Sequence, residues 1–175
     1  MKRSLAIIVV AGMLMPVATT VLGAADQRGQ LSEKDYKFVK DAFMGGTAEI
    51  QMGQLASTKA ENPALKDFGQ RMVTDHTKAN DELRRIAESK GAMLPTDISR
   101  RENFDFDRYQ KLSGKKFDEE YAEHMVKDHK KDVKEFQDAS TELTDPELKA
   151  FVTKTLPTLQ DHLRSAQEIE ASLKK

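Results

Sequence analysis

The sequence predicts an all-α protein, a bundle of four long helices arranged as two antiparallel hairpins. Four segments of the chain repeat apolar residues every three or four positions, which is the period of an amphipathic helix. Few stretches show the strict alternation of apolar and polar residues that a half-buried strand requires. Two of the three connections between these segments are only a few residues long, and short connections favour antiparallel neighbours.

The first hairpin has clear start and stop signals. The first helix is expected over residues 33–60, with Ser32 as its N-cap and Asp35 three positions later, a variant of the capping box. The second helix begins at Asn62-Pro63, an N-cap followed by proline at the first helical position. It is expected to stop at Gly91. The two helices therefore follow each other with almost no loop.

The second hairpin follows a much longer connection. Residues 92–115 form this crossover, and residues 100–112 within it have the pattern of a short helix. The third long helix is expected over residues 116–141. The fourth begins at Asp145-Pro146 and continues nearly to the C-terminus, with an expected kink at Pro157. Two helical hairpins joined by one long crossover with a short helix describe the ferritin-like class of four-helix bundle.

The N-terminus has the layout of a secretory signal peptide. Lys2 and Arg3 precede an apolar run over residues 5–15, which Pro16 closes, and small residues follow at 23–25. The run is too short for a membrane-spanning helix, which needs about 18 or more apolar residues. An uncleaved N-terminal anchor is the alternative.

Cleavage divides the chain into two parts. Residues 1–25 are predicted to be the cleaved signal peptide, and residues 26–175 the bundle domain. We therefore expect a periplasmic or outer-membrane-associated protein, with association at the envelope or membrane surface and self-association into a homo-oligomer both left open. The sequence contains no cysteine, which excludes disulfides and cysteine–metal sites.

The charge of the predicted mature domain argues against nucleic acid as a partner. Removal of Lys2 and Arg3 from the 28 basic residues leaves 26 against 29 acidic ones, a net charge of about −3. Both signs are interspersed along the helices, without the basic stripe and interleaved aromatic residues that nucleic-acid binding requires. This pattern is typical of solvated helix surfaces.

Four polar residues interrupt the apolar faces of the helices at the same depth. Glu49, His76, His129 and His162 each lie within about three residues of the midpoint of their own helix, or ~4.5 Å at 1.5 Å per residue. Antiparallel helices of similar length align their midpoints. The sequence therefore predicts that these four side chains meet in one layer of the bundle.

Neutral imidazole and carboxylate together suit one zinc, iron or copper ion, so we take Glu49, His76, His129 and His162 as candidate metal ligands. An aspartate precedes each histidine, and these carboxylates are expected to accept the second N–H of a neighbouring histidine: Asp75, Asp128 and Asp161. Weaker candidates are Met72, Met125 and His124. The alternative is a buried hydrogen-bond network that only fixes helix packing.

Four blocks of the sequence are specific in combination: FVKDAFMGGTAEIQMGQLA (38–56), NPALKDFGQRMVTDHTKANDEL (62–83), SGKKFDEEYAEHMVKDHKK (113–131) and LPTLQDHL (156–163). In these blocks the chain resembles the bacterial family called domain of unknown function 4142. The resemblance implies an exported periplasmic or outer-membrane protein of the ferritin-like superfamily. It implies no activity.

A di-iron centre is not expected. Ferritin-like di-iron proteins carry Glu-x-x-His on two helices, but Val73 and Leu159 stand three residues before His76 and His162. A mononuclear, histidine-rich site is more plausible. The sequence thus favours a non-catalytic protein that binds a transition metal for metal handling or stress protection in the envelope. The alternative is a structural or interaction module of the envelope, whose partner helix would lie on the glycine-rich face of the first helix.

A hydrolase is the weakest candidate. A serine or threonine on the stripes of the polar layer would be needed as nucleophile, and only Thr155 is near.

Overall fold

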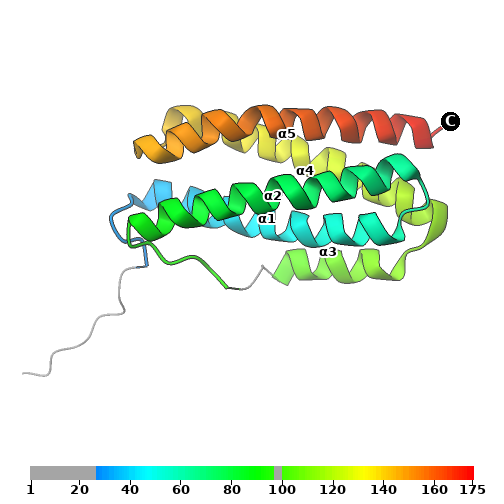
Figure 1. Ribbon diagram of the computed structural model, residues 1–175, viewed down its shortest axis with the longest axis horizontal. Helices are drawn as coiled ribbons and strands as arrows, with labels where there is room; N and C mark the ends of the chain where they lie inside the picture. The colour runs from blue at the N-terminus through cyan, green and yellow to red at the C-terminus, as the bar shows by residue number, and fades with distance from the viewer. Residues whose placement is uncertain (1–26, 97–99) are drawn as a thin grey trace, which may run out of the picture.

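The computed structural model describes residues 27–96 and 100–175, and every regular element in these ranges is a helix (Figure 1). The elements are α1 (Glu33–Lys59), α2 (Pro63–Ser89), α3 (Arg100–Lys111), α4 (Gly114–Glu142) and α5 (Pro146–Leu173). The predicted signal peptide, residues 1–25, lies outside the described residues. The prediction of an all-α protein is confirmed.

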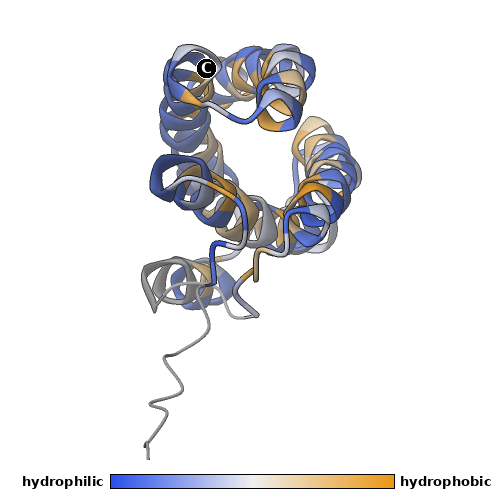
Figure 2. Ribbon diagram, turned by 90° about the vertical axis from the view of Figure 1, so that its left-hand side faces the viewer, coloured by the Kyte–Doolittle hydropathy of each residue, from blue (hydrophilic) through white to orange (hydrophobic). Residues whose placement is uncertain are grey.

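The four long helices form two antiparallel hairpins, α1 with α2 and α4 with α5, as Figure 1 shows. The crossover carries α3, which packs beside α1. Viewed end-on, the four long helices surround a common centre (Figure 2). This is the ferritin-like bundle that the sequence predicts.

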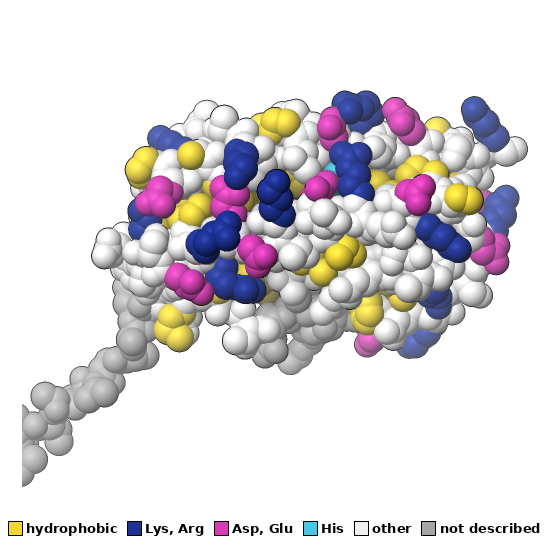
Figure 3. Space-filling view, viewed as in Figure 1, with side chains coloured by type: hydrophobic (Ala, Val, Ile, Leu, Met, Phe, Trp, Pro, Cys, Tyr) yellow, Lys and Arg dark blue, Asp and Glu magenta, His cyan; other side chains and the backbone are white. Residues whose placement is uncertain are grey.

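The surface of the bundle is mixed in charge. Basic and acidic side chains alternate over the face that Figure 3 shows. No helix in the described part of the chain combines the length and apolar character that crossing a membrane requires.

The caps fix where the helices begin. The Ser32 hydroxyl accepts the backbone N–H of Asp35 at 3.1 Å. The side chains of Asn62 and Asp145 each accept two backbone N–H groups in the first turns of α2 and α5. α5 is continuous through Pro157, and its kink stays a prediction. α4 is longer than predicted, from Gly114 to Glu142 rather than 116–141, because its first helical bond already runs to residue 113.

The polar layer divides the core into two apolar clusters. The first cluster packs the start of α1, the end of α2, the end of α4 and the first half of α5, around Phe38, Leu83 and Phe151. The second packs the opposite halves of the same helices, around Phe68 and Phe117. Burial of apolar surface in both clusters holds the helices at fixed depth relative to one another, so the middle turns of the bundle are rigidly placed.

Each interhelical turn is held by a buried carboxylate from the other hairpin. Asp35 of α1 accepts the backbone N–H of Thr144 at 2.9 Å and its hydroxyl at 2.5 Å. Asp118 of α4 accepts the backbone N–H groups of Glu61 and Asn62 at 3.1 and 2.8 Å. The predicted capping box at Ser32 is therefore only half formed, since the carboxylate of Asp35 binds the α4–α5 turn.

Substitution of Asp35 is expected to weaken the dependence of the free energy of unfolding on pH in the acidic range. Burial raises the pKa of Asp35, but hydrogen bonds from Thr144 and Ser32 outweigh it and hold the pKa below its ordinary value of 3.8. A carboxyl with a lowered pKa in the folded state stabilises the protein above pH 3.8, and this contribution is lost as pH falls through the folded pKa. Asp35→Ala should lower the free energy of unfolding at pH 7 by about 1–3 kcal/mol.

Urea denaturation at pH 7 and at pH 3 measures both effects. The difference between the wild type and Asp35→Ala should be smaller at pH 3. If the two proteins differed by the same free energy of unfolding at pH 7 and at pH 3, the charge of the Asp35 carboxylate would not contribute to stability.

Candidate metal centre

The bundle brings Glu49 of α1, His76 of α2, His129 of α4 and His162 of α5 together between the two apolar clusters. His129 and His162 are 0% exposed, and Glu49 and His76 are each 5% exposed. The histidine rings lie with their centroids 5.3 to 5.9 Å apart. Three imidazoles of three different helices therefore share one water-poor space.

Two of the histidines are held by carboxylates of neighbouring helices. His76 Nδ1 lies 3.0 Å from Glu49 Oε2, and His162 Nε2 lies 2.8 Å from Asp75 Oδ2. A carboxylate only accepts, so the imidazole must donate at these atoms. Each contact therefore fixes the N–H on one ring nitrogen and leaves the other nitrogen with a lone pair.

The third histidine is held by its own helix. His129 Nδ1 lies 3.0 Å from the backbone carbonyl oxygen of Met125. The carbonyl can only accept, so Nδ1 carries the proton and Nε2 carries a lone pair. All three imidazoles are thus oriented by the kind of partner that normally orients metal-binding histidines.

The remaining ring nitrogens are His76 Nε2, His129 Nε2 and His162 Nδ1. All three are buried and have no hydrogen-bond partner among the described residues, although His129 Nε2 comes within 3.4 Å of Glu49 Oε1. One nitrogen from each of the three rings lies within 4.8 Å of the others. Buried polar atoms are normally paired, so three buried nitrogens without a hydrogen-bond partner, on rings that bring donor atoms this close together, indicate a site for an electron-pair acceptor.

Burial keeps the three imidazoles neutral. Burial lowers the pKa of His76 to about 4. Burial also lowers the pKa of His129, and together with the positive charge that His76 and His162 can carry it brings this pKa to about 3. It lowers the pKa of His162 to about 4, although the bond to Asp75 works in the opposite direction. Neutral imidazole is the form that binds metal ions, and at pH 7 no proton has to be displaced.

A second group of donor atoms adjoins the first, and it includes a residue that the sequence analysis missed. Single donor atoms of Glu49, His129 and Asp132 lie within 4.8 Å of one another. Burial raises the pKa of Asp132 well above its ordinary value, and the charges of Glu49 and Asp128 raise it further. A cation bound between the carboxylates of Glu49 and Asp132 would relieve the repulsion between their negative charges. The spacing His129-x-x-Asp132, which places both residues on one face of α4, was the signal in the sequence.

The other candidates from the sequence lie outside both groups. Asp161 pairs with Arg164 at 2.5 Å rather than with a histidine. Asp128 acts on His76 only through its charge. His124 packs its ring against Tyr109, with the centroids 5.2 Å apart. The weaker sulfur candidates are fully buried in the second apolar cluster: Met72 and Met125.

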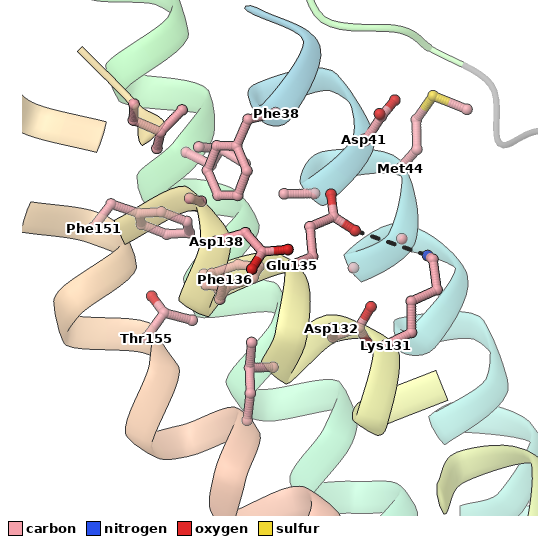
Figure 4. A pocket seen from close by; sticks show the side chains of 18 of the residues that line it. Phe38, Asp41, Met44, Lys131, Asp132, Glu135, Phe136, Asp138, Phe151 and Thr155 are labelled. Atoms are coloured by element: carbon pink, nitrogen blue, oxygen red, sulfur yellow. Dashed lines mark ion pairs between the residues drawn. The ribbon is translucent and has the colours of Figure 1, made fainter. Parts of the chain in front are cut away.

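A groove connects the polar layer to the surface. α1 and α4 contact each other much less than the helices within each hairpin do, and a groove of about 830 Å³ opens between them. Figure 4 shows its wall, with Asp41 and Met44 on α1 and Lys131, Asp132 and Glu135 on α4. Glu49 and His76 also line it. The layer can therefore be reached from this face.

Comparison with known proteins identifies a family and a fold. A family model described as "Domain of unknown function (DUF4142)" matches residues 21–169. No curated protein matches the chain. A DUF305 fragment from Deinococcus radiodurans has a similar structure, with a TM-score of 0.72 at 9% identity over 81% of this chain and 98% of the fragment.

The protein CopM also has a similar structure. Its Cu(II)-bound form gives a TM-score of 0.66 at 18% identity, over 79% of this chain and 96% of CopM. Its Cu(I)-bound form gives 0.64 at 18% identity, over 77% and 93%. At these identities the similarity shows the fold alone.

Proposed function

This chain belongs to the DUF4142 family of unknown function, and we propose that it binds one transition-metal ion through His76, His129 and His162. The observation that carries the proposal is that three buried rings each keep one nitrogen without a hydrogen-bond partner and bring donor nitrogens within 4.8 Å of one another. Each ring is already oriented by a hydrogen bond at its other nitrogen, so the site is organised before a metal binds. Glu49 orients His76 and adds an oxygen donor beside the same point.

Copper is the first candidate for the ion. Imidazole suits copper and zinc, and copper has the highest affinity among the divalent first-row ions for such donors. The structurally similar CopM is known in Cu(II)-bound and Cu(I)-bound forms.

The role that fits this site is metal handling or protection from metal stress rather than catalysis. With Glu49 beside the three histidines, four protein donors would fill a four-coordinate site, whereas catalytic metal sites keep a position open to substrate. The predicted signal peptide supports a location in the cell envelope, where an exported protein would meet metal ions from outside. A purely structural polar layer fits less well, because such layers are stabilising only when every member is satisfied.

Elemental analysis of the exported protein tests this function. The protein is purified without a histidine tag or chelators, beside the variant His76→Ala/His129→Ala/His162→Ala and the control His124→Ala. We expect about one metal ion per chain in the wild type and the control, and none in the triple variant. Absence of metal from the wild type, or equal metal in the triple variant, would contradict the proposal.

A further inference from the structure

Among the described residues that line the groove, the carboxylate of Asp132 is the one that is paired with neither a lysine nor a histidine. The acidic side chains at its mouth are paired with lysines: Lys37–Asp41 at 2.6 Å, Lys134–Asp138 at 2.6 Å, Lys34–Glu142 at 3.2 Å and Lys131–Glu135 at 3.9 Å. Asp132 takes part in no hydrogen bond or ion pair with the described residues. It is half-buried, between the exposed lysines and the fully buried histidines. Asp132 is therefore placed to meet a cation that enters the groove.

The donor group of Asp132 overlaps the three-histidine group at a single residue. Glu49, His129 and Asp132 bring donor atoms within 4.8 Å of one another, and so do His76, His129 and His162. His129 belongs to both groups, but its Nδ1 is bonded to a backbone carbonyl. It therefore has one nitrogen, Nε2, for both. A single ion bound to that nitrogen can have oxygen partners toward the groove or nitrogen partners toward the core.

We propose that Glu49, His129 and Asp132 form an outer cation site, through which a divalent transition-metal ion passes between the groove and the three histidines. The proposal rests on the proposed function of the three-histidine site. Two carboxylates and one imidazole suit a hydrated divalent ion arriving from water, whereas three imidazoles suit a more dehydrated one. The passage is an exchange of ligands without a change of oxidation state: the ion keeps His129, releases Asp132 and gains His76 and His162, while Glu49 stays beside both positions.

The position of Glu49 supports this passage. Its carboxylate oxygens lie 3.0 Å from His76 Nδ1 and 3.4 Å from His129 Nε2, so it borders both donor groups. It also lines the groove together with Asp132 and His76. The lysines at the mouth are neutralised by their acidic partners, and they do not oppose the entry of a cation.

The test measures rates as well as affinity. Cu²⁺ is mixed with metal-free protein and followed by its visible absorbance, and its release is followed after addition of excess chelator. Asp132→Asn should slow both association and release by about tenfold or more, because the ion passes the same outer site in both directions and loses one of its three donors there. The affinity and the stoichiometry should stay within about threefold of the wild type. Asp132→Glu, which keeps the charge, should restore most of the rate.

Asp138→Asn is the matched control, because it removes one carboxylate from the same groove away from the polar layer and frees only Lys134, whose side chain is 73% exposed and therefore screened by solvent. Its rates should stay close to those of the wild type. Equal rates in Asp132→Asn and Asp138→Asn would overturn the outer site. Loss of stoichiometric binding in Asp132→Asn would also overturn it, because Asp132 would then be a ligand of the resident ion. Failure of the wild type to bind Cu²⁺ or any other metal would instead refute the three-histidine site.

Discussion

Replacement of His129 by leucine is expected to abolish metal binding while leaving the metal-free protein at least as stable as the wild type. His129 is the residue common to both donor groups, so neither group keeps three donors without it. Loss of an outer hydrogen-bond partner costs a metal site about 10–100-fold in affinity, and loss of a ligand should cost more. We therefore expect affinity to fall by more than about 100-fold.

The expected stability of His129→Leu has a separate physical reason. The imidazole is 0% exposed, and its Nε2 makes no hydrogen bond with the described residues. An unsatisfied buried polar group costs about 1–3 kcal/mol, and its replacement by an apolar side chain of similar size is often neutral or stabilising. The Met125 carbonyl loses one donor but keeps its helical hydrogen bond. The free energy of unfolding should change by between 0 and about +2 kcal/mol.

Competition with a chelator of known affinity measures the metal binding of His129→Leu, and urea denaturation in excess chelator measures its stability. His124→Leu is the control, since His124 packs on Tyr109 away from the layer, and it should keep the wild-type affinity. Destabilisation of the metal-free His129→Leu by more than about 2 kcal/mol, together with a wild type that holds no metal, would support the alternative that the histidines only fix helix packing.

Substitution of Gly69 by alanine is expected to destabilise the bundle by about 1–2 kcal/mol, because α1 and α2 touch at this position. A Cβ atom on Gly69 would lie 2.7 Å from the carbonyl oxygen of Gly53 and 2.8 Å from the backbone nitrogen of Ser57. Both are backbone atoms of α1, so the clash can be relieved only by moving the helices apart. Such overpacking typically costs about 1–3 kcal/mol and outweighs the gain in helix propensity.

Gly45→Ala is the matched control, since a Cβ atom there would meet nothing within 4 Å. It should stabilise the protein by about 0.5–1 kcal/mol through helix propensity alone. Urea denaturation of both variants beside the wild type measures the two effects. The free energy of unfolding should fall in Gly69→Ala and rise in Gly45→Ala, although both variants add the same methyl group. A Gly69→Ala variant as stable as the wild type would show that the helices can separate at no cost.

The close approach of α1 and α2 also matters for the metal site. Gly53 lies one helical turn after Glu49, and a Cβ atom on it would lie 3.0 Å from the Cβ of Met72, one turn before His76. The contact at the glycines therefore sets the distance between Glu49 and His76. The glycine-rich face of α1 is the one that the sequence predicts to admit a close helix. Two of its glycines, Gly46 and Gly53, contact α2 of the same chain, whereas the third, Gly45, faces the groove.

Much of the architecture could be predicted from local signals. The caps at Ser32, Asn62 and Asp145 place the starts of three helices, and Gly91, with φ +68°, follows the end of α2. These signals depend on a few adjacent residues and on hydrogen bonds within one turn, which is why no tertiary information was needed. The depth of the polar layer follows in the same way, from the midpoints of helices of similar length.

The sequence by itself therefore determined the four helices, their pairing and the meeting of Glu49, His76, His129 and His162 at one depth. Only the tertiary structure decided that Asp75 binds His162, which ring nitrogens remain unpartnered, and that Asp132 borders the layer from the groove. Helical periodicity gives the direction of a side chain to within one face, about 100° per residue. The partner that it meets depends on the rotation and separation of neighbouring helices, and packing along their whole length sets both.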